Sequence, residues 1–289
     1  MGVQPGWWAA ANARTDRRRG KPNQVPRRTL GVEATRTGHA RHSKVVVCPG
    51  ASLRHVSQPL QQLAGRVWLY PHDPDPDAIR GSVAVVADDR GSVLVDAGNG
   101  PAAAREVQDA IAAAGLPSPR WLVYTHNHWD HTWGACAWDG VEVVGHAAGQ
   151  PILDAEARRP WSHAYLRDQV DANPRLGPSF RARALAMPSF DGFRIVPPDT
   201  TFTDTLTLPT GVRLRHVGGQ HAPDSLVVLD PESYVALLGD CFYPPPFHER
   251  SDGDGTDQRM VRRLLAERHD WYVDAHSAPR RYTTAASNA

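Results

Sequence analysis

One short stretch, residues 126–131, decides how this chain is interpreted: it is His126-Asn127-His128-Trp129-Asp130-His131. It holds three imidazoles and a carboxylate directly after the apolar run at residues 121–124. Neutral imidazole and carboxylate are ligands of divalent metals, and zinc takes four such ligands at roughly 2.0 to 2.2 Å. An isolated histidine is usually a hydrogen-bonded loop or helix-cap residue. So dense a group of ligand-type side chains instead predicts a metal site.

The spacing within the stretch indicates how the side chains are presented. In a strand, alternation would send His126, His128 and Asp130 to one side, so a strand end turning into a loop fits best. His128 and His131 are three residues apart, as neighbours on a helix face are. A short helix beginning there would turn Asp130 and His131 toward a second ion, while His126 and His128 hold the first. The spacing therefore favours two metals.

The surrounding sequence alternates between strand and helix signals. Val-rich segments separated by Gly, Pro or Asp predict short strands, and the Ala-rich stretch from Pro101 to Ala114 predicts an amphipathic helix. Residues 147–192 are rich in Pro, Arg and aromatic residues and predict short helices and loops that could cover a cleft. Strands are expected at residues 66–70, 82–87, 92–95, 122–124, 202–206, 212–217, 225–229, 234–238 and 271–273, and a second helix at 257–268. Two strand-rich halves, each with helices, predict an α+β fold in which a β-sandwich is flanked by helices.

Two histidines of one motif cannot complete a metal site, so further ligands are expected at strand ends elsewhere. Three candidates follow predicted strands. His221 comes after Gly218-Gly219-Gln220, Asp240 ends the apolar segment 235–239, and His276 follows the strand that begins at Trp271.

With these residues, the chain resembles the metallo-β-lactamase superfamily over roughly residues 64–280. Residues 125–134 resemble its T-H-x-H-x-D-H-x-x-G signature, and His221-Ala222-Pro223-Asp224-Ser225 resembles its H-T-P-G-S element. Residues 93–98 resemble its early strand-Asp-x-Gly element, residues 238–240 its G-D, and residues 274–277 its closing G-H-G. The resemblance implies an αββα sandwich of two mixed β-sheets flanked by helices.

The resemblance also implies the ligands of two zinc ions, with iron or manganese as other candidates. The first site would use His126, His128 and His221. The second would use Asp130, His131 and His276, with Asp240 bridging both. Asp96 is expected to support the ligand loop by hydrogen bonding rather than to bind metal. Asp224 and Ser277 stand where the family usually has Gly, so both of these loops are expected to differ in shape.

The composition limits the class of protein to which the chain can belong. The chain has 289 residues, 41% hydrophobic and 22% charged, which predicts one soluble domain with a tail. No apolar run approaches the roughly 18 residues of a membrane helix and no secretory signal is evident, so a cytoplasmic location is expected. The three cysteines, Cys48, Cys136 and Cys241, form no C-x-x-C pair, which argues against a disulfide framework or a thiolate zinc cluster.

Charge is distributed unevenly. Residues 1–44 contain ten Lys and Arg against Asp16 and Glu33, although the whole chain carries only +1. Residues 1–63 are expected to form a basic, disordered extension, and residues 64–289 the catalytic domain. The extension has few apolar residues, which favours disorder without a specific function. The arginines between residues 158 and 183 are interleaved with Pro and Ala rather than with aromatic residues, and no additional nuclease domain is evident, so nucleic acid is an unlikely partner and a small-molecule substrate is favoured. The oligomeric state is left open.

The leading hypothesis is hydrolysis. A hydroxide held between two zinc ions would attack an ester, thioester, lactone or amide, and Asp130 would orient the nucleophile. The alternatives are a mononuclear iron enzyme resembling persulfide dioxygenases, which would consume oxygen, a nucleic-acid-processing relative, and a binding protein with a degenerate site. Flavodiiron-type chemistry is disfavoured because His128 stands where those proteins tend to carry Glu.

Other residues of ligand or pocket type receive secondary interpretations. Aromatic residues could wall an apolar pocket near the metals: Trp129, Trp133, Trp161, Tyr165, Phe190, Phe242 and Tyr243. Structural roles are expected for the remaining candidates: His146, His163, His216, His248, His269 and Cys241.

Overall fold

The computed structural model describes residues 58–282. The first strand, β1, spans Gln61–Ala64, and the buried Leu60 lies directly before it. Ordered structure is therefore present a few residues before residue 64, where the sequence pattern placed the start of the domain. The rest of the basic extension lies outside the described residues. None of the helices in the described part of the chain has the length and apolar character needed to cross a bilayer.

A seven-stranded sheet is built from the first part of the domain, in the order β1 to β7. Its first four strands pair antiparallel and its last three join in parallel. The helix α1 (Pro101–Ala113) makes the crossover from β4 to β5. The strands after β1 are β2 (Val67–Tyr70), β3 (Val83–Val86), β4 (Ser92–Val95), β5 (Pro119–Val123), β6 (Glu142–His146) and β7 (Thr200–Phe202).

A six-stranded sheet follows, in the order β13-β12-β11-β10-β9-β8. Only β11 and β12 pair in parallel, and α6 (Gln258–Leu265) lies between them in sequence, with Asp257 as its N-cap. The strands are β8 (Thr205–Thr207), β9 (Arg213–His216), β10 (Leu226–Asp230), β11 (Val235–Gly239), β12 (Trp271–Asp274) and β13 (Arg280–Arg281). Both sheets are therefore mixed, as the family resemblance implied.

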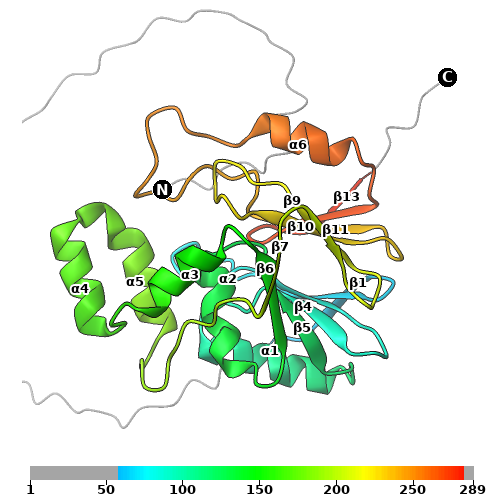
Figure 1. Cartoon of the computed structure of the whole chain (residues 1–289), viewed down its shortest axis with the longest axis horizontal. Helices are drawn as coiled ribbons and strands as arrows, with labels where there is room; N and C mark the ends of the chain where they lie inside the picture. Colours follow the sequence, from blue (N-terminus) through cyan, green and yellow to red (C-terminus); the bar gives the residue numbers. More distant parts are fainter. Residues whose placement is uncertain (1–57, 283–289) are drawn as a thin grey trace, which may run out of the picture. The chain divides into compact units, whose positions relative to one another are not determined.

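Two apolar clusters define the layers. In the first, Val107 and Ile111 of α1 pack with Leu94 and Leu122 on one face of the first sheet. In the second, Val93 and Val123 from the opposite face pack against strands of the second sheet such as β10 and β11. On the second sheet, the Tyr272 hydroxyl donates to the Leu264 carbonyl of α6 at 3.1 Å. The order helix, sheet, sheet, helix confirms the expected αββα sandwich (Figure 1).

Between β6 and β7 the chain forms a group of short helices, as the weak periodicity of residues 147–192 predicted. These are α3 (Gln150–Ala157), α4 (His163–Ala172), η2 (Pro174–Leu176) and α5 (Gly177–Ala186). The Ser162 side chain caps α4, and Asn173 caps η2. Figure 1 shows α3, α4 and α5 grouped beside α2 (Trp129–Thr132).

The strand expected at residues 202–206 is wrong as a single element. The structure ends β7 at Phe202 and starts β8 at Thr205, and the two strands belong to different sheets. The chain crosses between the sheets at Thr203 and Asp204, a change of pairing partners that side-chain alternation does not reveal.

Candidate metal centre

Asp96 fixes the loop that carries the histidine stretch through hydrogen bonds to its carboxylate. Asp96 follows β4 with φ at 65°, and its carboxylate accepts hydrogen bonds from the Thr125 backbone N–H at 2.8 Å and the Thr125 hydroxyl at 2.9 Å. His131 Nδ1 lies 2.8 Å from the same carboxylate. The stretch then enters α2, which has His128 at its N-cap. The expected strand end, loop and short helix are all present.

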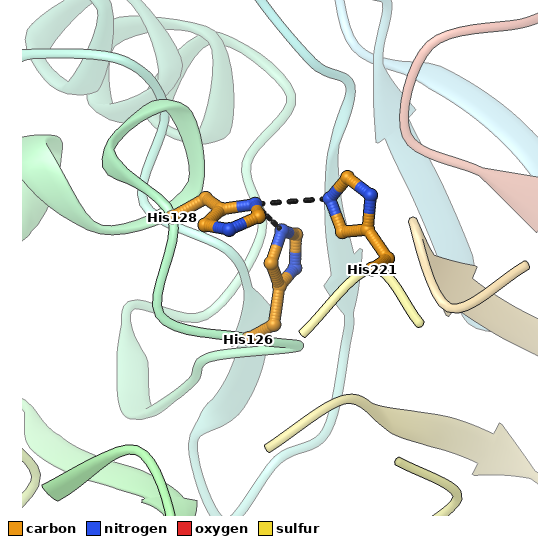
Figure 2. Close-up of side chains that lie close together, drawn as sticks. All are labelled: His126, His128 and His221. Carbon is orange, nitrogen blue, oxygen red and sulfur yellow. Dashed lines mark hydrogen bonds between the residues drawn. The ribbon is translucent and has the colours of Figure 1, made fainter. Parts of the chain in front are cut away.

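Three histidines converge on one point (Figure 2). His126 Nε2 lies 2.9 Å from His128 Nδ1, which lies 2.9 Å from His221 Nε2. His126 and His128 come from the loop after β5, and His221 from the loop between β9 and β10. The first expected ligand set is therefore brought together from the two sheets.

Hydrogen bonds on the far side of two rings determine which nitrogen carries the proton. His221 Nδ1 lies 2.8 Å from the Pro244 carbonyl and must donate to it, so Nε2 presents a lone pair. Thr125 gives its hydroxyl proton to Asp96, so His126 Nδ1 must donate to Thr125 Oγ1 at 3.1 Å, and His126 Nε2 also presents a lone pair. A single proton on His128 Nδ1 can be donated to only one of these two lone pairs, on His126 Nε2 and His221 Nε2. A cation between the three nitrogens would satisfy both.

A second cluster contains Asp130, His131, Asp240 and His276. His276 Nε2 lies 3.2 Å from Asp130 Oδ2 and 3.3 Å from Asp240 Oδ2. His131 Nε2 lies 3.4 Å from Asp130 Oδ2 and 3.6 Å from Asp240 Oδ2. These four side chains are the expected second ligand set together with the expected bridging residue.

Asp240 lies between the clusters, because its Oδ2 atom is also 3.4 Å from His221 Nε2. Its position requires the glycine before it. Gly239 has φ at 52°, and a Cβ there would meet the Thr125 side chain at 2.5 Å. A side chain at residue 239 would therefore push β11 away from the histidine loop.

Two buried atoms in the second cluster have no hydrogen-bond partner, His131 Nε2 and Asp240 Oδ1. Since His131 Nδ1 is committed to Asp96, its other nitrogen is directed at the carboxylates without a bond. Unsatisfied buried donors and acceptors of this kind are costly unless a ligand satisfies them. The donor set, five imidazoles and two carboxylates, fits divalent ions such as zinc.

In the first cluster and at the shared carboxylate, the electrostatics favour metal-binding protonation states. Burial, reinforced by neighbouring histidines, lowers the pKa of His126 well below its usual value and that of His128 to about 3, so both are neutral at pH 7. Burial alone would raise the pKa of Asp240, but His276 and His131 hold it well below the ordinary range. Ionised carboxylate and neutral imidazole are the forms that ligate metals.

The two rings of the second cluster instead hold protons. Despite burial, the carboxylates of Asp96, Asp130 and Asp240 raise the pKa of His131 well above its usual value. Despite burial as well, Asp240 and Asp130 raise the pKa of His276 to about 10. An ion must therefore displace a proton from each of these two rings.

The two residues that depart from the family pattern, Asp224 and Ser277, both lie beside the ligand loops, and Asp224 Oδ1 is buried without a hydrogen-bond partner. Asp224 is 3% exposed, and burial raises its pKa to about 7, while backbone N–H groups of Asp224 itself and Asn127 oppose the rise. It therefore contacts the backbone between His126 and His128. The Ser277 hydroxyl donates to Asp274 at 2.6 Å, and the His276 N–H donates to the same carboxylate at 3.0 Å. Asp274 thus orders the loop that carries His276.

A cavity of about 600 Å³ opens onto both clusters. His128 and His221 of the first cluster and Asp130, Asp240 and His276 of the second line it. Its remaining wall comes largely from α3 and the residues that follow it, from the segment between η2 and α5, and from the loop around residues 246–249. The residues lining this wall include Ile152, Leu153, Glu156, Arg159, Leu176, Pro178, Phe180, Arg183, Pro246, Phe247, His248 and Glu249. Residues 147–192 therefore do contribute to the covering of a cleft.

The expected aromatic wall is realised only in part. Trp129 and Trp133 line the cavity, whereas Trp161, Tyr165, Phe190, Phe242 and Tyr243 are not among its lining residues. Phe180 and Phe247, which sequence reasoning did not select, do line it. Arg183 was also missed as a pocket residue, since nothing in its Ala- and Arg-rich segment distinguishes it from Arg181.

The other histidines have partners outside the clusters. The rings of His146 and His216 stack at 3.6 Å, and His146 Nε2 also bonds the Thr203 carbonyl at 2.7 Å. His163 Nε2 bonds the Met187 carbonyl at 2.8 Å. His248 differs, because it lines the cavity. Burial raises the pKa of the Cys241 thiol, which agrees with a packing role.

Comparison with known proteins identifies the family. The family model of the metallo-beta-lactamase superfamily matches residues 76–284, which includes all seven clustered side chains. A search of curated proteins finds no match.

Many solved structures have the same fold, and the following three are distant in sequence. TMB-1 is 16% identical with a TM-score of 0.53, covering 77% of this chain and 91% of its own. A metallo-beta-lactamase from Erythrobacter litoralis is 20% identical with a TM-score of 0.51, covering 77% and 90%. FIM-1 from Pseudomonas aeruginosa is 16% identical with a TM-score of 0.50, covering 78% and 91%. The chain belongs to the metallo-β-lactamase superfamily and, with it, to the metallo-hydrolases.

Proposed function

We propose that this chain is a binuclear zinc hydrolase that cleaves an ester, thioester, lactone or amide bond in a small molecule. One observation carries the proposal: seven ligand-type side chains from two sheets form two adjacent clusters, and one oxygen of Asp240 lies close to both. The cavity that opens onto these clusters is of the size that holds small-molecule ligands.

His126, His128 and His221 would hold the first ion and Asp130, His131 and His276 the second, with Asp240 shared. When bound, two divalent ions supply Lewis acidity toward a carbonyl oxygen and lower the pKa of water toward 7. Zinc is favoured over manganese because imidazole predominates in the donor set. The FIM-1 relative was solved in a mono-zinc form, which supports the choice of metal.

The protein's own groups have separable roles in this scheme. Asp130 lines the cavity, and His131 and His276 keep its pKa well below the ordinary value despite burial, so it is ionised and can orient an attacking water by accepting its proton. Asp96 and Thr125 fix the imidazole tautomers. Trp129 and Trp133 keep part of the cavity wall apolar, which limits access of bulk water.

The second cluster supports hydrolysis over the mononuclear dioxygenase alternative. Asp130, His131, Asp240 and His276 offer ligand atoms within 4.8 Å of one another, a set that could hold a second ion.

The test is a hydrolysis panel of lactone, thioester, aryl ester, β-lactam and phosphodiester substrates, run with and without chelator. At least one acyl substrate is expected to be hydrolysed in a chelator-sensitive way, and His126→Ala and Asp240→Ala are expected to abolish turnover. His269→Ala is the matched control, because His269 lies outside both clusters. Hydrolysis that survives in metal-free Asp240→Ala would refute the proposal, and oxygen consumption without hydrolysis would favour the dioxygenase.

A further inference from the structure

Arg183 is a cation in the wall of the cavity that makes no direct ion pair with a described residue, although the charges of Glu156 and Asp130 act on it from a distance. It lies on α5 and lines the same cavity as the two metal clusters. Its Nε and Nη1 atoms are buried and have no hydrogen-bond partner. No ion pair of its guanidinium with another described residue is present. Burial lowers the pKa of Arg183 to about 10, so it stays protonated at neutral pH.

Aromatic rings surround this guanidinium. Its Cζ atom lies 4.4 Å from the ring centre of Phe180, 5.3 Å from Trp129, 5.5 Å from Trp133 and 5.8 Å from Trp161. Cation–π contacts compensate part of the lost hydration and hold the side chain in place. They do not supply hydrogen-bond acceptors. Because Nε and Nη1 are closed off by the ring cluster, Nη2 is the nitrogen left to meet a ligand.

The cavity's other charged groups already have partners. Arg159 forms an ion pair with Glu156 at 3.0 Å, and Glu249 lies 3.4 Å from His248 Nε2. Asp130 and Asp240 belong to the candidate metal clusters. Of the two arginines among the cavity's described lining residues, Arg183 is therefore the one free to form an ion pair with a bound ligand. A desolvated cation binds an anion more strongly than one in water.

We propose that Arg183 receives a carboxylate of the substrate, so that the hydrolysed ester, thioester, lactone or amide also bears a carboxylate group. A singly charged group suits one free guanidinium. The four carboxylates that line the cavity disfavour a dianion such as a phosphate monoester. The proposal rests on the hydrolase function for the identity of the substrate, but the anion site itself is testable without turnover.

The test compares phenylacetate with phenylacetamide, which have the same aromatic body and differ in charge. Trp129, Trp133 and Trp161 are packed around Arg183, so their fluorescence reports binding. Titrations are run on the full chain, both metal-free and zinc-loaded. We expect wild type to bind the acid at least about tenfold more tightly than the amide in both forms, the preference typical of a hydrogen bond to a charged group.

Two variants and one control assign this preference to Arg183. Arg183→Gln is expected to lose the preference while still binding the amide, and Arg183→Lys to keep part of it. Arg181→Gln is the matched control, because Arg181 lies two residues away on the same helix, is exposed and does not line the cavity. It is expected to behave as wild type.

Three results would overturn the proposal. The first is equal binding of acid and amide by wild type, which needs no variant and so does not depend on any variant folding. The second is a preference that Arg183→Gln retains. The third is a preference that appears only with zinc and does not respond to residue 183, because the metal would then be the anion receptor. Failure of the hydrolysis panel alone would leave an Arg183-dependent preference intact and would refute only the catalytic proposal.

Discussion

Asp96 is the residue on which the ligand loop most depends. Its carboxylate receives the Thr125 N–H, the Thr125 hydroxyl and His131 Nδ1, and the Thr125 hydroxyl in turn fixes the proton of His126. One side chain thereby sets the tautomers of a histidine in each cluster. Partners of this kind orient ligands and raise their basicity.

Replacing Asp96 with Asn is expected to weaken zinc binding by about 10- to 100-fold, because one carboxylate oxygen is replaced by an amide NH2 group, which donates hydrogen bonds and cannot accept them. Competition with a chromophoric chelator would measure the affinity. The matched control is Asp199→Asn, since Asp199 accepts the Val143 N–H at a site outside both clusters. Unchanged affinity in Asp96→Asn would contradict the positioning role.

Gly134, the last residue of the signature, is required for packing. A Cβ at this position would lie 2.0 Å from the Ala97 carbonyl oxygen and 3.2 Å from the Ala104 side chain. The motif therefore ends in glycine because η1 (Trp133–Ala137) passes directly against the backbone that follows β4.

Gly134→Ala is expected to lower the free energy of unfolding by about 1–3 kcal/mol, the usual cost of overpacking. Urea denaturation measures it. Gly255→Ala provides the comparison, because a Cβ at Gly255 would meet no atom within 4 Å. Equal stability of the two variants would show that the close approach is not restrictive.

At the scale of elements, the sequence predicts best where a local pattern is sufficient. The helix predicted from Pro101 to Ala114 is α1, and the loop and short helix at residues 126–131 have the expected form. The residues of the histidine stretch were found by their density, and His221, Asp240 and His276 because each follows a predicted strand, while the family resemblance divided them into two sets. Arg183 was not found, since its surroundings combine α5 with α2 and η1, which lie far from α5 in the sequence. The crossing at Thr203 and Asp204 was missed for a similar reason, because strand pairing is a long-range property.

Arg66 links elements of both sheets near the turn between β3 and β4. Its guanidinium bonds Asp88 at 2.8 Å, Asp230 at 2.7 Å and the Thr210 carbonyl at 3.0 Å. The pKa of Asp88 is lowered to about 2, first by its hydrogen bond with Arg90 and also by the charge of Arg66.

This shift predicts a specific dependence of stability on pH. Asp88 titrates near 3.8 when unfolded and near 2 when folded, so its ionised form favours folding. Its contribution is fully present above about pH 4 and is lost as the pH falls toward 2. The stability difference between wild type and Asp88→Asn should therefore shrink over that range, as measured by urea denaturation in chelator. The control is Asp89→Asn, because the exposed Asp89 shares none of these bonds. A difference independent of pH would contradict the shifted pKa.

At the scale of the whole molecule, the clusters join the two halves of the sandwich. His126, His128, Asp130 and His131 follow β5 of the first sheet, and His221, Asp240 and His276 follow strands of the second. Metal binding should therefore stabilise the assembled domain as a unit.

Zinc is expected to raise the free energy of unfolding by about 2.7 kcal/mol at a free concentration one hundred times its dissociation constant. Thermal denaturation of chelator-treated protein with increasing zinc would measure the effect. His126→Ala should respond less, because one cluster lacks a ligand. A melting temperature insensitive to zinc would mean that the ion does not bind preferentially to the folded state.

The most direct test of the central claim is the number of zinc ions bound per chain, measured by elemental analysis after equilibrium dialysis of the chelator-treated protein. The proposed centre predicts about two in wild type. No bound zinc, or zinc that remains at the wild-type level in Asp240→Ala, would contradict the assignment of these seven side chains to a binuclear site.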